Sequence, residues 1–200
     1  AAEGDIFCAG ADLRREESES NVPKLEGSDD ISLMLRHLYK PVICKIQGSV
    51  LAGALLMVTN STHAVAVQEA KFSAPEILRG LWPHMVMAGL FRVMPKRAGL
   101  DFVMRGQSID AKQAKEWGLI NEFVRAEELD DYVNKLSEEL ASLAPGTMSF
   151  GLEAYEKQDA MAFDEALPFL QKQIAKTFEG PDAKEGIAAF LEKRKPNWDK

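Results

Sequence analysis

Residues 41–67 constrain the fold more than any other part of the sequence, because they place two strongly apolar strands on either side of an apolar helix. The first strand is predicted in "PVICKIQG", which is rich in β-branched residues and ends at Gly48; the second is predicted in "HAVAV" at residues 63–67. Between them, "SVLAGALLMVTN" predicts a turn followed by an apolar helix. Strands of this kind are typical of parallel sheets covered by helices, so we expect an α/β fold.

The segment before this region predicts a further strand and an exposed loop. Residues 6–9 form a short apolar run that meets Gly10 and then a polar, helix-compatible segment, which predicts a strand, a turn and a helix. Residues 16–30 are charged and contain proline and glycine, so we expect an exposed loop. A helix is predicted from Ile31 and ends before Pro41.

The pattern changes after about Arg125. The stretches "EELDDYVNKLSEELASLA" and "FDEALPFLQKQIAKTF" are amphipathic, with acidic residues near their starts, which favours helices. We therefore expect residues 1–125 to form the α/β core and residues 126–200 to form a C-terminal helical lobe that serves in oligomerisation.

Composition excludes several classes of partner. The net charge of −7 and the pI near 5.1 argue against binding to nucleic acid, so any anionic ligand must meet a local group of basic residues. The longest apolar run covers residues 50–58, far short of the roughly 20 residues that a membrane span needs.

Cys8 and Cys44 do not form a disulfide framework, which favours a reducing compartment such as the cytoplasm. His37 and His63 lack neighbours at ligand spacing, so we expect no metal site.

Two turns made of small residues are candidates for stabilising a negative charge. In "FCAGADL" the backbone N–H of Ala11 is predicted just after a strand and in the first turn of a helix, and Gly53 in "GSVLAGALL" has the same predicted setting. Two such donors that converge on one carbonyl oxygen form an oxyanion hole. Small residues at these turns also serve close packing or a positive φ alone, and the residues by themselves leave both interpretations open.

Five motifs in order resemble the enoyl-CoA hydratase/isomerase family, which has the crotonase fold, and the resemblance covers essentially the whole chain. They are "FCAGADL", "KPVICKIQGSVLAGALL", "AKFSAPEILRGLWP", "RGQSIDAKQAKEWGLINEFV" and "EGIAAFLEKRKPNW". The resemblance implies a spiral of ββα units, an acyl-CoA substrate whose thioester enolate is stabilised, and a homotrimer or a dimer of trimers. It implies no cofactor beyond the coenzyme A of the substrate, and it makes Ala11 and Gly53 the oxyanion-hole donors.

The resemblance also sets expectations about completeness and location. The family's chains carry a further segment ahead of the first motif, so we expect the first turn of the spiral to be missing from this chain and the core to be incomplete at its N-terminal side. We expect a cytoplasmic protein, or one of the mitochondrial matrix or peroxisome if the source is eukaryotic.

The acidic residues distinguish this chain from the family's hydratases, which hold a water molecule between two glutamates. The first of these positions falls on Leu56, eight residues after Gly48, and leucine neither orients water nor transfers a proton. The second falls on Glu76 in "APEIL", which the resemblance makes the catalytic residue. Taken locally, Glu76 is also explained as an ordinary acidic residue at a helix start after Pro75.

A single glutamate favours movement of a double bond over addition of water. Isomerisation needs one base that moves a proton between two carbons, whereas hydration needs a positioned water as well. Leu56 is expected to exclude water and to raise the pKa of Glu76. We therefore expect a Δ3-Δ2 enoyl-CoA isomerase. An enoyl-CoA hydratase, another acyl-CoA reaction of the family and a catalytically inactive acyl-CoA-binding subunit remain the alternatives.

Further residues are predicted to contact the substrate. Trp82 and His84 in "GLWPHMVMAG" are expected to line the acyl pocket, and His84 is either a second acid or base or a surface loop histidine. Arg14 is a candidate for binding CoA phosphates, with an ordinary solvated helix face as the alternative. In "AAFLEKRKPNW" the resemblance implies that Phe190 and Lys193 reach the CoA of a neighbouring subunit, while locally the basic residues complement a helix end.

Overall fold

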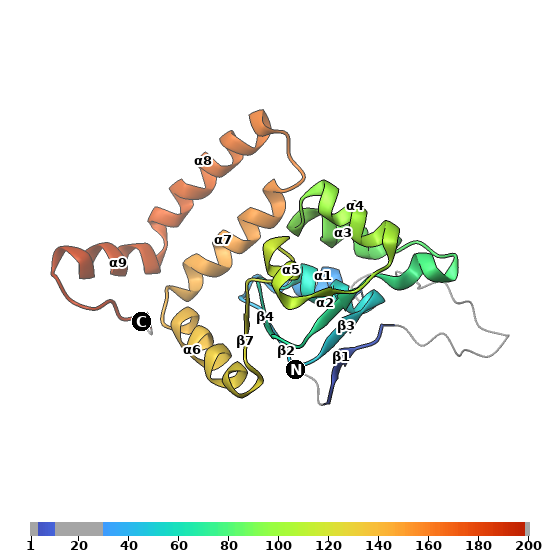
Figure 1. The fold of residues 1–200 in the computed structure, drawn as a ribbon. Coiled ribbons are helices and arrows are strands. Elements are labelled where there is room, and N and C mark those ends of the chain that lie inside the picture. The colour runs from blue at the N-terminus through green and yellow to red at the C-terminus, as the bar shows by residue number, and fades with distance from the viewer. Residues whose placement is uncertain (1–3, 11–29, 199–200) are drawn as a thin grey trace. The chain divides into compact units, whose positions relative to one another are not determined.

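A computed structural model describes residues 4–10 and 30–198, and the chain divides into two compact units. One unit contains residues up to 35 together with residues 41–135, and the other contains residues 36–40 and residues from 136 onward (Figure 1). The predicted division into an α/β core of residues 1–125 and an oligomerisation lobe of residues 126–200 stays a prediction. Residues 11–29, which contain the predicted exposed loop except for its last residue, Asp30, lie outside the described part.

The first unit is built on two small sheets. One has the strand order β1-β3-β5-β6 and the other has the order β2-β4-β7. All neighbouring strands are parallel except β5 and β6, which are antiparallel, so the predicted parallel α/β fold is confirmed. The strands are β1 (Ile6–Cys8), β2 (Ile43–Ile46), β3 (Ser49–Leu51), β4 (His63–Val67), β5 (Lys71–Ser73), β6 (Ile109–Asp110) and β7 (Glu122–Val124).

Short helices follow most of these strands. The described helices are α1 (Ile31–Arg36), α2 (Leu55–Asn60), α3 (His84–Val93), α4 (Lys96–Arg105), α5 (Ala111–Glu116), α6 (Leu129–Ala141), α7 (Pro145–Gln158), α8 (Phe163–Glu179) and α9 (Pro181–Leu191). Three 3-10 helices accompany them: η2 (Ala52–Ala54), η3 (Pro75–Arg79) and η4 (Ala126–Glu128). No helix in the described residues is long and apolar enough to cross a membrane.

Residues 49–51 form a strand, although the sequence predicted a turn there. The backbone N–H of Ser49 donates to the carbonyl oxygen of Asp5 at 3.0 Å, and Val50, which is completely buried, pairs with both β1 and β5. A Cβ on the preceding Gly48 would collide with the carbonyl oxygen of Asp5. Glycine therefore ends the predicted first strand and also lets β1 approach β3 closely.

The core of the first unit joins the strands to the helices that follow them. Its largest fully buried side chains each come from a different element, namely Ile46, Val50, Leu55, Val65, Phe72, Leu90 and Val103. Helices α2 and α3 pack closely at Gly89, where a Cβ would collide with the side chain of Thr59. The buried strands predicted from residues 41–67 therefore form the centre of this unit.

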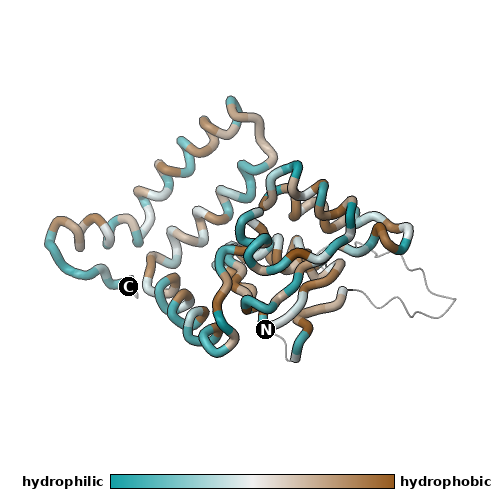
Figure 2. The backbone as a smooth tube through the Cα atoms, in the orientation of Figure 1, coloured by the Kyte–Doolittle hydropathy of each residue, from teal (hydrophilic) through white to brown (hydrophobic). Residues whose placement is uncertain are grey.

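The second unit is helical, as the amphipathic pattern predicted. The backbone N–H of Thr147 donates to Asp182 Oδ2 at 2.7 Å, which joins the start of α7 to α9. Arg36 lies in this unit and forms ion pairs with Glu156 at 2.7 Å and Asp159 at 3.2 Å. Apolar residues recur along α8 (Figure 2). Large apolar side chains exposed on α8 are Phe163, Leu167, Leu170, Ile174 and Phe178.

Candidate active site

Three parallel strands bring the candidate residues to one edge of a sheet. Strands β1, β3 and β5 are neighbours, with Leu51 of β3 opposite Ser73 of β5. The carboxyl ends of parallel strands lie at the same edge, which is where ligands bind in many α/β proteins. Gly10 follows β1, Gly53 follows β3 and Glu76 follows β5, so the turns that carry these residues share that edge.

The first two of these turns are in direct contact. A Cβ on Gly10 would lie 3.1 Å from the backbone nitrogen of Gly53 and 3.2 Å from the carbonyl oxygen of Leu51. Gly10 also has a φ of 84°, a conformation that residues with a Cβ rarely adopt. Sequence reasoning assigned Gly10 only a turn. Ala11, the predicted first oxyanion donor, lies outside the described residues, as does Arg14.

The backbone before Gly53 is strained. Ala52 has a φ of 53°, in the left-handed region that costs a residue with a side chain roughly 1–2 kcal/mol. Such strain is found at sites where the surrounding structure requires an unusual backbone direction. Here it reverses the chain between β3 and η2, so that Gly53 lies in the first helical turn, whose N–H groups lack partners within the helix.

Leu56 lies on α2 in the position where the resemblance led us to expect an acid in a hydratase. Its side chain is half-buried, whereas its neighbour Leu55 is completely buried in the core. No residue from 51 to 60 is acidic, basic or histidine. The start of α2 therefore offers backbone donors and apolar side chains, but no group that titrates.

Glu76 is the ionisable residue that the third turn places at this edge. Its Oε2 atom is buried and has no hydrogen-bond partner among the described residues. Burial raises the pKa of the Glu76 carboxyl, while its own backbone N–H and the nearby Arg79 act in the opposite direction. A half-buried carboxyl with a raised pKa, one oxygen of which has no partner in the described part of the chain, is a candidate for a general base or acid.

Trp82 and His84 lie in the segment that follows η3. Trp82 is half-buried, and its Nε1 lies 3.0 Å from the sulfur of Met87. His84 is the first residue of α3 and is exposed, so it begins a helix and does not lie in a loop. Their predicted contact with an acyl group stays a prediction.

Phe190 and Lys193 lie at the end of α9 in the second unit. The side chain of Phe190 is 81% exposed. The N–H of Lys193 donates to the carbonyl of Phe190 and the N–H of Arg194 donates to that of Ala189, which together form a Schellman motif. Lys193 occupies the left-handed position of this motif, with a φ of 54°, where glycine is usual.

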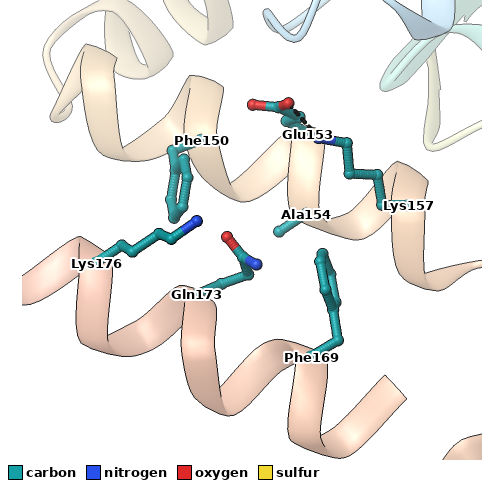
Figure 3. Close-up of a pocket in the computed structure, with 7 residues that line it drawn as sticks. All are labelled: Phe150, Glu153, Ala154, Lys157, Phe169, Gln173 and Lys176. Carbon is teal, nitrogen blue, oxygen red and sulfur yellow. Dashed lines mark hydrogen bonds and ion pairs between the residues drawn. The ribbon is translucent and has the colours of Figure 1, made fainter. Parts of the chain in front are cut away.

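The helical unit also contains a shallow cavity between α7 and α8, with a volume of about 270 Å³. Phe150 from α7 and Phe169 from α8 project toward it, and an ion pair between Glu153 and Lys157 lies at its side (Figure 3). None of the predicted site residues lines this cavity. The described residues contain no cluster of histidine, cysteine or acidic residues that could hold a metal ion.

Comparisons with known proteins agree with this arrangement. The family model for enoyl-CoA hydratase/isomerase matches residues 1–200. The mevalonyl-coenzyme A hydratase sidH of Aspergillus fumigatus is 31% identical to this chain, over 98% of the chain and 74% of the relative. A probable enoyl-CoA hydratase of Bacillus subtilis is also 31% identical, over 98% of the chain and 78% of the relative.

A solved structure of an enoyl-CoA hydratase from Mycobacterium smegmatis superposes on the chain with a TM-score of 0.90 at 28% identity. The match covers all of this chain and 79% of the other. The fold is therefore the crotonase fold, as the sequence motifs indicated. The chain belongs to the enoyl-CoA hydratase/isomerase family and is an enzyme of that family.

Proposed function

We propose that the protein is a Δ3-Δ2 enoyl-CoA isomerase in which Glu76 is the only proton-transferring side chain. The observation that carries the proposal is the buried oxygen of Glu76, which has no hydrogen-bond partner among the described residues and lies in the turn after β5, the strand paired with β3, which precedes Gly53; position 56 is apolar. The site then supplies one base and an oxyanion hole. Such a set suits a reaction in which no other molecule is added to the substrate.

In the proposed reaction, ionised Glu76 removes a proton from the α-carbon of a 3-enoyl-CoA. The electron pair of the broken C–H bond moves into the thioester and gives a dienolate, whose oxygen accepts hydrogen bonds from the N–H groups of Gly53 and Ala11. The protonated Glu76 then delivers the proton to the γ-carbon, which leaves a 2-enoyl-CoA. The carboxylate is regenerated, and no atoms are gained or lost.

Leu56 gives this site its selectivity for isomerisation. A water molecule beside the dienolate would compete with Glu76 as a proton donor or would add to the product double bond. An apolar side chain on α2 disfavours an ordered water there and also keeps the carboxyl of Glu76 less hydrated, consistent with its raised pKa.

Hydration of a 2-enoyl-CoA is the second candidate. It is favoured by the names of relatives, because the proteins from Aspergillus fumigatus and Bacillus subtilis are both described as hydratases. In that case a group other than Leu56 must position the water. The proposed isomerase and this alternative differ in whether solvent oxygen enters the product.

Binding of coenzyme A is proposed to require a neighbouring copy of the chain, in a homotrimer or a dimer of trimers. Phe190 is apolar yet almost fully exposed, and Lys193 retains a side chain at a position where glycine is less strained. The apolar stripe of α8, defined by Phe163, Leu167, Ile174 and Phe178, supports association as well, because exposed patches of this kind mark interaction surfaces.

A reducing compartment suits the unpaired Cys8 and Cys44.

The deciding experiment follows both reactions with the same preparation. The protein is incubated with a 3-enoyl-CoA and, separately, with a 2-enoyl-CoA in ¹⁸O-labelled water. Chromatography separates the double-bond isomers, and mass spectrometry measures the ¹⁸O content of each product. We expect double-bond migration without ¹⁸O incorporation. Hydration faster than migration would establish the second candidate, and tight binding without either reaction would indicate an inactive acyl-CoA-binding subunit.

A further inference from the structure

Gln47 connects the strand β1 to the chain segment between β2 and β3. Its side-chain Nε2 donates to two carbonyl oxygens of the first strand region, that of Gly4 at 3.1 Å and that of Ile6 at 3.2 Å. One amide group therefore holds two backbone groups that are two residues apart. Gln47 itself precedes Gly48, whose missing side chain lets Asp5 approach.

The carbonyl of Ile6 lies on the side of β1 that faces away from β3. The carbonyl of Asp5 accepts from Ser49 and so points toward β3. Because successive backbone groups of an extended strand alternate in direction, the carbonyl of Ile6 points the other way. In the described residues β1 is at the edge of its sheet, and no strand pairs with it on that side. The amide of Gln47 supplies hydrogen-bond donors there.

The position of β1 matters because the turn at Gly10 follows it directly. The space where a Cβ of Gly10 would lie is 3.1 Å from the backbone nitrogen of Gly53. The β1 strand is only three residues long, and its pairing with β3 is irregular between Ile6 and Cys8. Because this pairing is so short, hydrogen bonds between β1 and β3 alone do not fix the position of the turn at Gly10. Other contacts must help to hold this turn against Gly53.

We infer that Gln47 is a positioning residue for the oxyanion hole: its amide holds β1 so that the turn at Gly10 meets Gly53. The inference deepens the proposed function and rests on it for the role of Gly53. The other half of the amide supports this role, because Gln47 Oε1 is buried without a hydrogen-bond partner among the described residues. A buried oxygen without a hydrogen bond costs free energy. The two hydrogen bonds that Nε2 donates to Gly4 and Ile6 offset this cost.

The test compares substitutions that change only the amide. Gln47→Met keeps the length of the side chain and removes the donor, while Gln47→Glu also places a negative oxygen against the two carbonyls. Gln68→Met is the matched control, because Gln68 is exposed and its side-chain amide donates to the neighbouring Glu69. Gln47→Asn keeps a donor on a shorter side chain and is expected to give an intermediate result.

The readout is polarisation of a bound thioester, which a purely structural residue would not alter. An aryl-conjugated 2-enoyl-CoA has no γ-proton to transfer, and its absorption moves to longer wavelength when its carbonyl accepts strong hydrogen bonds. We expect this shift in the unchanged protein and in Gln68→Met, a reduced shift in Gln47→Met, and the smallest shift in Gln47→Glu. For isomerisation, kcat of Gln47→Met should fall about tenfold with KM within about twofold, as when a transition-state interaction is weakened.

Unfolding in denaturant establishes that each variant is folded before its spectrum is compared. If Gln47→Met does not fold, Gln47→Asn takes its place, with a shift expected between that of the unchanged protein and that of Gln47→Glu. The inference is overturned if folded variants at position 47 bind the probe with the shift of the unchanged protein. Failure of the proposed function has a different signature, in which the unchanged protein shifts the absorption of the probe but does not isomerise a 3-enoyl-CoA.

Discussion

The Cβ atom of Ala52 lies 3.1 Å from the position that a Cβ on Gly10 would take, and the backbone nitrogen of Gly53 lies equally close to it. Gly10→Ala should therefore force the two turns apart and also strain the backbone, since Gly10 has a φ of 84°. We expect isomerase kcat to fall at least tenfold and unfolding to become easier by about 1–2 kcal/mol.

Gly4→Ala provides a matched control for this substitution. Gly4 has a φ of 85°, almost identical to that of Gly10, but a Cβ there meets no described atom within 4 Å. We expect a similar loss of stability with most of the activity retained. If Gly4→Ala reduces kcat as much as Gly10→Ala, backbone strain alone accounts for the effect, and the contact with Gly53 has no special role.

Glu76→Gln tests the proposed base. Glutamine keeps the shape of the side chain but cannot accept the α-proton, so isomerisation should fall by about 10²–10⁴-fold while binding of the CoA thioester is largely kept. Steady-state kinetics and calorimetric binding measure the two quantities. Glu69→Gln, at an exposed position after β4, is the control. Retention of wild-type isomerisation in Glu76→Gln would show that another group moves the proton.

The raised pKa of Glu76 predicts how activity depends on pH. The base must be ionised, so kcat/KM should rise with pH through the pKa of Glu76, at a higher pH than the ordinary glutamate value of about 4.3. A pH profile whose acidic limb lies at or below that ordinary value would contradict the prediction.

The same shift predicts the pH dependence of stability, with a definite sign. A carboxyl whose pKa is higher in the folded than in the unfolded protein stabilises the fold below its unfolded pKa, and this contribution is lost as pH rises through the folded value. Relative to Glu76→Gln, the unchanged protein should therefore become less stable as pH increases from about 4 toward neutrality. Denaturant unfolding of both proteins across this range measures the difference.

Leu56→Glu tests the proposed preference for isomerisation over hydration. A carboxylate on α2 would attract water and disfavour ionisation of a nearby Glu76, so we expect slower isomerisation and a trace of hydration, detectable as ¹⁸O in the product. Leu56→Gln separates polarity from charge: it should slow isomerisation less and raise the acidic limb of the pH profile less. Unchanged isomerisation in both variants would remove Leu56 from the mechanism.

Lys193→Gly separates the backbone conformation of Lys193 from its proposed contact with CoA. Glycine relieves the φ of 54°, so the free energy of unfolding should increase by roughly 0.5–1 kcal/mol. If the Lys193 side chain reaches CoA, affinity for an acyl-CoA should decrease at the same time. Lys193→Asn tolerates the same backbone conformation and should weaken binding in the same way. A more stable protein with unchanged affinity would make the lysine dispensable for the ligand.

The strands that could be predicted from the sequence are those whose own residues are apolar enough to require burial. The apolar runs around Ile46 and Val65 must be buried wherever they lie, so both strands were predictable, as were the amphipathic helices α6 and α8. Residues 49–51 were mistaken for a turn because their strand exists only through pairing with β1 and β5. Such pairing depends on residues far away in the chain, which local patterns do not record.

The candidate site shows the same limit. Glu76 and Gly53 were identified from motifs, but the register that sets Leu51 opposite Ser73, and so places both turns at one edge of the sheet, was not predictable. The positive φ of Ala52 was also hidden, because alanine gives no local signal for a left-handed conformation. Gln47 lies within one of the quoted motifs but was given no role, since its bonds to Gly4 and Ile6 join segments about forty residues apart.

The buried oxygen of Glu76 has a consequence for the barrier of the reaction. In water, a carboxylate must shed ordered solvent before it can approach a C–H bond, and the rearrangement of that solvent contributes to the activation energy each time. In this protein the oxygen has already left water when the chain folds, and no hydrogen bond among the described residues has to break before it moves. In the proposed mechanism this reorganisation is incurred once during folding, and every later turnover begins without it.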